Sequence, residues 1–85
     1  MRILGHIPYK NIRIIVFGMN DKYVIRFEAG LMEQVFKINQ NEISGMDGIS
    51  ELLDEAFMEK IIHRFNEMFT EFDKAKNRFN EKSHT

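Results

Sequence analysis

Three segments of the chain carry apolar residues with the two-residue period of β-strands. Asn11–Met19 and Lys22–Ala29 are rich in Ile, Val, Phe and Tyr, and the intervening Asn20-Asp21 is typical of a tight hairpin turn. Gly30 interrupts the second segment, and Leu31–Ile38 resumes the pattern. The pattern predicts a three-stranded antiparallel meander in the order 1-2-3, with the second strand central.

A two-residue turn also predicts the strand register. It sets these residues opposite one another: Val16 and Ile25, Ile14 and Phe27, Ile12 and Ala29, and Arg13 and Glu28. The first three pairs are apolar and the last is charge-complementary on the other face, which favours cross-strand contact. A slip of one residue would move every side chain to the wrong face. In the third strand, Met32, Phe36 and Ile38 are expected on the core face, with Glu33 and Lys37 pointing away.

After the predicted sheet, the period of the apolar residues changes to that of a helix. Residues at alternating spacings of three and four form one line, called here the helix stripe: Met58, Ile61, Phe65, Met68, Phe72, Ala75 and Phe79. Ile62 and Phe69 widen it, as a core-facing helix requires. Asp47 or Ser50 can cap the start, and Asp54 can cap a second helix if the chain breaks there. The pattern predicts a long amphipathic helix.

The expected fold is therefore one α+β domain, in which the long helix covers the three-stranded sheet. Its predicted parts are an extended lead-in, the sheet, a loop, a helix with a possible break near residue 54, and a frayed tail. These parts span residues 1–10, 11–38, 39–48, 49–80 and 81–85.

The predicted helix is longer than the predicted sheet. Residues 55 to 80 span roughly 38 Å as a helix, whereas strands of about eight residues span about 27 Å. The helix stripe nevertheless continues through Phe72 to Phe79, with Phe69 beside it. Each phenylalanine left in water forgoes roughly 1.5–3 kcal/mol of burial. We expect these three side chains to extend past the sheet and to contact a partner.

The outer face of the predicted sheet offers a second apolar surface. By the expected register this face carries an outer patch made up of Ile15, Phe17, Val24 and Val35. Four contiguous apolar side chains approach the largest patch found on ordinary monomers. Charged neighbours and the N-terminal segment can also shield such a patch, so the sequence leaves open whether it is an interface.

Composition excludes several classes of function. The 85 residues carry a net charge of −1, which gives no overall field to attract nucleic acid or an anionic membrane. Cysteine is absent, which removes disulfides, thiolate metal sites and thiol nucleophiles. The N-terminal residues do not resemble a signal peptide, and the longest apolar run, Ile14 to Phe17, is far too short to span a bilayer. We expect a cytoplasmic protein.

Candidate chemistry is sparse. Glu59, His63 and Glu67 lie at i, i+4 and i+8, a spacing that can present ligands to zinc but is also common on solvated helix faces. His6, beside Pro8 and Tyr9, can form a small binding loop or simply pack over the sheet edge.

Other functional motifs are weaker. Arg13, Arg26 and Lys37 beside Phe17 suggest a platform for single-stranded nucleic acid, but Glu28 and Glu33 on the same face oppose phosphate. No nucleophile, base and oxyanion donor occur together, so we expect neither an independent enzyme nor a bound cofactor or metal.

Three stretches carry a resemblance to a family. They are Gly5-His6-Ile7-Pro8, Lys22-Tyr23-Val24-Ile25-Arg26-Phe27-Glu28 and Gly30-Leu31-Met32-Glu33-Gln34-Val35-Phe36-Lys37-Ile38. In these the chain resembles a family of small uncharacterised bacterial α+β proteins of unknown function. The resemblance covers most of the chain through its general pattern and implies no activity or site.

The sequence favours a non-enzymatic protein-interaction module, either a homodimer or a small accessory subunit. Its expected interface comprises Phe69, Phe72 and Phe79 on the helix and the outer patch on the sheet. Two other hypotheses stay open: a small-ligand or metal-binding domain around His6 or His63, and a weak single-stranded nucleic-acid binder on the outer sheet face.

Overall fold

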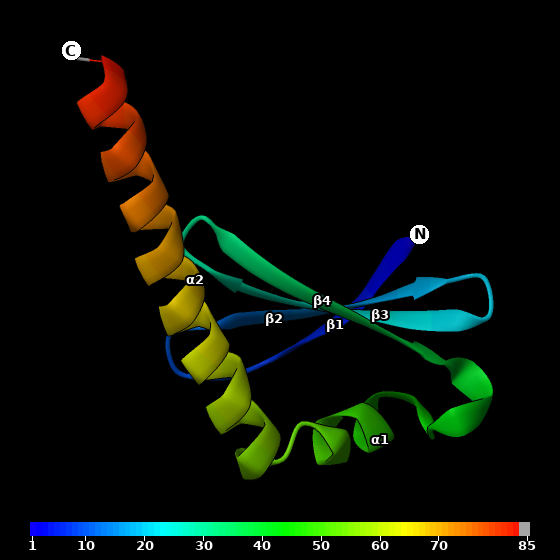
Figure 1. Ribbon diagram of the computed structural model, residues 1–85. Helices are drawn as coiled ribbons and strands as arrows, with labels where there is room; N and C mark the ends of the chain where they lie inside the picture. Colours follow the sequence, from blue (N-terminus) through cyan, green and yellow to red (C-terminus); the bar gives the residue numbers. More distant parts are fainter. Residues whose placement is uncertain (84–85) are drawn as a thin grey trace.

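A computed structural model describes residues 1–83 of the chain as one antiparallel sheet with helices against one face (Figure 1). The sheet has four strands, and each pairs with its neighbour in the sequence, giving the order β1-β2-β3-β4. The elements are β1 (Arg2–Ile7), β2 (Arg13–Met19), β3 (Lys22–Ala29), β4 (Met32–Asn39), the 3₁₀ turn η1 (Gln40–Glu42), α1 (Gly45–Leu52) and α2 (Glu55–Ser83).

The predicted α+β architecture with a long C-terminal helix is confirmed, but the prediction of three strands is wrong. The segment expected to be an extended lead-in forms β1, which pairs with β2 from Arg2 opposite Gly18 to Ile7 opposite Ile14. Pro8 follows the strand and so removes no ladder hydrogen bond from it. Without β1, the backbone groups on that side of β2 would lack a ladder partner. A register shift between Ile3 and Gly5 marks a β-bulge in this edge strand.

The register predicted for the first two long strands is confirmed. Val16 pairs with Ile25, Ile14 with Phe27 and Arg13 with Glu28. The predicted pairing of Ile12 with Ala29 falls just before β2, which begins at Arg13. Two-residue turns join β2 to β3 and β3 to β4, and each has a residue at positive φ: Asn20 at 56° and Gly30 at 59°. The third predicted strand is β4, shifted by one residue to Met32–Asn39.

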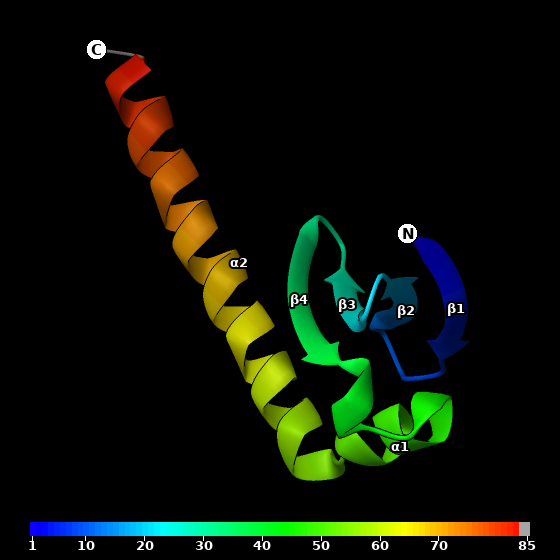
Figure 2. The same ribbon diagram turned by 90° about the vertical axis from the view of Figure 1, so that its right-hand side faces the viewer.

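The core lies between the inner face of the sheet and the two helices. In Figure 2 the strands curve from β4 to β1, α1 lies below them, and α2 passes beside β4. The buried residues come from both sheet and helices: Ile12, Ile14, Val16, Ile25, Phe27, Ile49, Met58, Ile61 and Phe65. The first half of the helix stripe is thus core, as its spacing predicted.

The chain has two helices with a break near Asp54, which the sequence left open, and the first helix begins earlier than expected. A separate helix, α1, begins at Gly45 inside the expected 39–48 loop and ends at Leu52. Asp47 and Ser50, expected to cap the helix start, lie within α1 instead. The backbone N–H of Phe57 donates to Asp54 Oδ1 at 2.9 Å, so Asp54 caps α2. Of the tail expected to fray, residues 81–83 belong to α2, and residues 84–85 lie outside the described part.

We expect Asp54→Ala to lower the free energy of unfolding by about 1 kcal/mol, because it removes this cap. Asp54→Asn is the matched control, since an amide oxygen accepts the same hydrogen bond and should keep most of the stability. Urea unfolding followed by circular dichroism measures both variants. Equal losses in the two variants would show that the carboxylate charge matters, not the cap.

Two features of the packing tie β4 to α2, and the sequence pattern missed both. Gln34 was not assigned to the core face, yet it is buried there, and its Nε2 donates to the Ile61 carbonyl at 2.9 Å. Phe57, just outside the helix stripe, stacks edge-on against Phe36 and Phe27 at ring-centroid distances of 5.4 and 6.1 Å. Phe36 also lies edge-on to Phe27 at 5.8 Å. One hydrogen bond and two ring contacts thus add to the apolar core that holds α2 against the sheet.

The molecule is elongated. Its principal extents are 55 × 27 × 18 Å and its radius of gyration is 16.2 Å, against about 12 Å for a compact domain of this length. The 29 residues of α2 account for this, since a helix of that length spans about 43 Å. Figure 1 shows its C-terminal half extending beyond the sheet.

Candidate functional site

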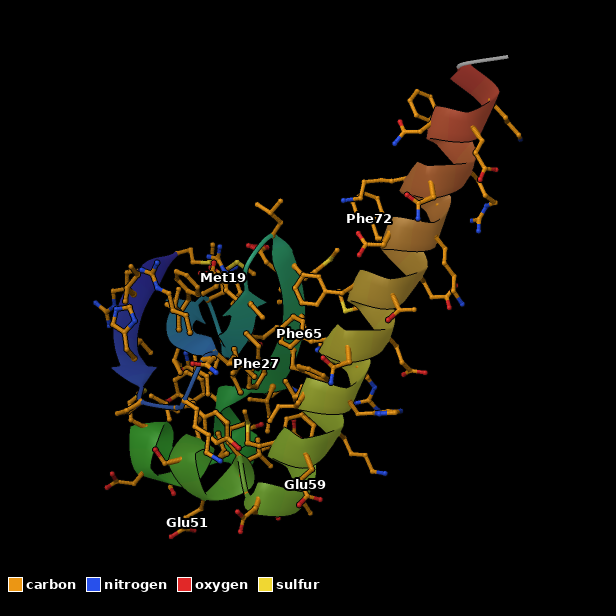
Figure 3. All side chains as sticks on the ribbon, turned by 90° about the vertical axis from the view of Figure 1, so that its left-hand side faces the viewer. Met19, Phe27, Glu51, Glu59, Phe65 and Phe72 are labelled. Carbon is orange, nitrogen blue, oxygen red and sulfur yellow. The ribbon has the colours of Figure 1, made fainter. Side chains whose placement is uncertain are left out.

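The projecting end of α2, residues 70–83, continues an apolar stripe past the edge of the sheet. Met58, Ile61 and Phe65 of the helix stripe are buried against the sheet. Figure 3 shows Phe65 directed toward the sheet, while Phe72 extends from the same side of α2 above the sheet edge. The exposed fraction rises along the helix, from 37% at Phe69 to 52% at Phe72 and 69% at Phe79. The expected overhang is therefore present in the single chain.

A shallow apolar groove lies where α2 leaves the sheet. Its volume is about 480 Å³, and it is lined by Leu31, Met32, Met68, Glu71, Phe72 and Ala75. Leu31, at the tip of the β3–β4 turn, is 96% exposed. The sequence pattern placed Leu31 at the start of a strand and so missed it. A large apolar residue directly after a turn glycine was the available signal.

Charged side chains border this apolar surface on both flanks. Lys76 Nζ lies 5.2 Å from the centre of the Phe72 ring, a cation–π contact that covers part of one flank. Within the helix, Glu71 Oε1 lies 3.7 Å from Lys74 Nζ, and Asp73 Oδ1 lies 3.3 Å from Lys76 Nζ. These pairs are exposed to solvent and contribute little stability. The charges can therefore be redirected toward a partner at small cost.

The outer patch is largely covered by its own chain. Ile15, Phe17 and Val24 are only 4%, 7% and 6% exposed, so the expectation that they form an open apolar surface is wrong. The Arg26 guanidinium lies 4.5 Å above the Phe17 ring. Among the four residues of the patch only Val35, on β4, is exposed. The curved sheet and the charged side chains above it shield the outer patch from solvent, which is one of the two alternatives that the sequence left open.

The charges over this face pair with each other. Arg26 Nη1 lies 3.6 Å from Glu28 Oε2 and 3.8 Å from Glu33 Oε2, and Arg13 Nη1 lies 3.9 Å from Glu28 Oε1. A phosphate approaching these arginines would meet two carboxylates. The geometry gives no support to nucleic-acid binding here, which stays an untested hypothesis.

The histidine hypotheses gain no ligand set from the geometry. His63 Nε2 lies 3.7 Å from Glu67 Oε1, with both side chains more than half exposed. Within residues 1–83, no three His, Asp or Glu side chains come together as metal ligands, so the structure does not gather Glu59 with this pair. His6 lies on β1 and borders a shallow surface hollow together with Pro8 and Tyr9.

Across the described residues, no helix combines the length and apolar character needed to cross a bilayer. Compared with protein-family models, curated protein sequences and solved structures, the chain gives no match. The resemblance to small bacterial proteins therefore stays a prediction.

Proposed function

We propose that this chain is a protein-interaction module that associates with a second copy of itself through the projecting end of α2. The observation that supports this most is the exposure of Phe72 and Phe79 on the same line of the helix that is buried lower down. Leu31 and the groove beside it extend the same apolar surface onto the sheet. A helical apolar stripe is a common element of dimer interfaces, and two-fold dimers are the most frequent oligomers.

The size of the surface suits a weak dimer. A phenylalanine side chain presents roughly 200 Å², so the exposed fractions of Phe72 and Phe79 leave about 240 Å² uncovered. At about 25 cal/mol per Å², covering this area contributes roughly 6 kcal/mol per copy. Association costs about 4–15 kcal/mol in lost freedom, which offsets most of the contribution from the two copies, so we expect a dissociation constant of about 1 μM at the tightest and a weaker one for a larger cost.

Replacing Phe72 by Glu tests the proposal, because the change puts a charge in the centre of the expected interface. We expect the dissociation constant to rise at least about tenfold, since an unpaired buried charge strongly opposes association. Sedimentation velocity over a range of protein concentrations measures it. Asn77→Glu adds the same charge on the opposite face of α2 and should leave association unchanged.

Circular dichroism at low protein concentration separates association from folding. Phe72 lies outside the buried core, so both variants should melt close to the wild type there. A wild-type chain that sediments as a monomer at every concentration would overturn the proposal and leave a different protein as the occupant of the surface. An equal rise of the dissociation constant in Phe72→Glu and Asn77→Glu would show that the apolar side of the projecting end of α2 is not the interface.

A further inference from the structure

Resting on the proposed self-association, we infer that the two copies pair with their α2 helices antiparallel, each Phe79 entering the groove beside the other copy's Leu31. Two features of the chain lead to this orientation: the side of α2 on which the sheet lies, and the order of charged residues along one flank of the helix stripe.

The position of the sheet excludes a parallel pair. The sheet packs on the stripe side of α2, where Met58, Ile61 and Phe65 are buried, and Figure 2 shows that the C-terminal turns of the helix extend beyond it. Two stripes meeting in parallel would bring both sheets into the space between the helices at the same level. In an antiparallel pair the two sheets lie at opposite ends, and the last turns of each α2 lie beside the other copy's β3–β4 turn.

An antiparallel overlap places each Phe72 against a small side chain of the partner. A two-fold axis halfway between Asp73 and Lys74 sets Phe72 opposite the partner's Ala75 and Met68 opposite the partner's Phe79. Alternating large and small residues across facing positions lets helices interdigitate without voids. At the level of Met68, the partner's Phe79 reaches the groove that Leu31 and Met32 help to line. Leu31, which is exposed in the single chain, is thus buried against the partner.

Charge complementarity supports the same register. Glu71 and Arg78 precede Phe72 and Phe79 and so lie on the same flank of the helix stripe, seven residues apart. Antiparallel pairing brings this flank against its equivalent in the other copy. With the axis described above, Glu71 lies within about two residues, or roughly 3 Å along the helix, of the level of the partner's Arg78. The symmetry produces two such Glu–Arg pairs. In a parallel pair, Arg78 would face the opposite flank instead.

Charge exchange tests this arrangement. Glu71→Arg and Arg78→Glu each create two like-charge contacts, so each should raise the dissociation constant about fivefold to twentyfold at low salt, and by less at 0.5 M salt. The double variant restores opposite charges and should return close to the wild-type constant. An equimolar mixture of the two single variants should form heterodimers in preference to either homodimer. Loss of association without rescue in either experiment would overturn the antiparallel register.

A distance measurement gives an independent readout of orientation. The chain contains no cysteine, so a spin label attached through Glu59→Cys occupies one defined site per copy. Antiparallel pairing about the stated axis separates the two labels by roughly 45 Å, whereas parallel pairing brings them within about 25 Å. A short distance in a dimer would reject the inferred orientation but keep the proposed function. A monomeric wild type would reject both.

Discussion

Phe27→Ala should lower the free energy of unfolding by about 3–5 kcal/mol, the largest effect expected from one apolar truncation in this chain. The Phe27 ring, on the inner strand β3, is fully buried and contacts Phe36 and Phe57 edge-on. Removing the ring leaves a cavity between β4 and α2, because Phe36 and Phe57 are held by different elements and cannot both move to fill it. A domain of this length has a total stability of about 4–13 kcal/mol, so this one substitution removes a large share of it.

Urea unfolding at low protein concentration measures this change. Phe79→Ala is the matched control, because it deletes the same ring from an exposed position and should cost the monomer less than about 0.5 kcal/mol. Similar losses in the two variants would mean that Phe27 is not the centre of the core.

Gln34→Glu should destabilise the chain in a pH-dependent way, by about 3 kcal/mol at neutral pH. The amide at this position is buried and donates to the Ile61 carbonyl, whereas an ionised carboxylate cannot donate and would face that oxygen. Burial disfavours the charged form, so the introduced carboxyl group should have a pKa above the ordinary Glu value of about 4.3 when folded. Its unfavourable contribution is therefore small below that value and grows as the pH rises.

The measurement is the difference in unfolding free energy between variant and wild type at several pH values. Gln34→Leu is the control: it loses the same hydrogen bond without adding a charge, and should cost about 1 kcal/mol at every pH. A pH-independent difference for Gln34→Glu would show that this position is solvated in the folded chain.

Hydrophobic periodicity predicted the parts of the fold in which burial alone decides the structure. The pairing of Val16 with Ile25 and of Ile14 with Phe27 follows from alternation and a short turn, since a slip would expose every apolar side chain. The helix stripe predicted which face of α2 is buried. Asp54 marked the helix break because its side chain can accept a backbone hydrogen bond.

The sequence was less informative where tertiary contacts override local pattern. β1 is short and carries glycine, histidine and a bulge, so only the open edge of β2 explains why it is a strand. A glutamine such as Gln34 is expected to be exposed, and it is buried here because the Ile61 carbonyl accepts its hydrogen bond. The prediction that the outer patch is exposed was wrong for a similar reason. Alternation predicts which face Phe17 occupies, but not that Arg26 will lie across its ring.

The candidate interface was predictable in part. The exposure of Phe72 and Phe79 followed from comparing the lengths of the helix and the strands, whereas the Phe69 ring lies close to Gly30 of the β3–β4 turn and is largely covered. The exposure of Leu31 did not follow from this comparison, since it depends on where the β3–β4 turn ends relative to α2.

The order of the elements along the chain has a consequence for synthesis. All four strands precede α2, and each hairpin closes between sequence neighbours, so the sheet can form early at little entropic cost. Its inner face, with Ile14 and Phe27, is nevertheless covered only when residues up to Phe65 are present. A nascent or shortened chain that ends before this point leaves the apolar inner face of the sheet exposed to solvent. This form is the one most at risk of aggregation and of binding by chaperones.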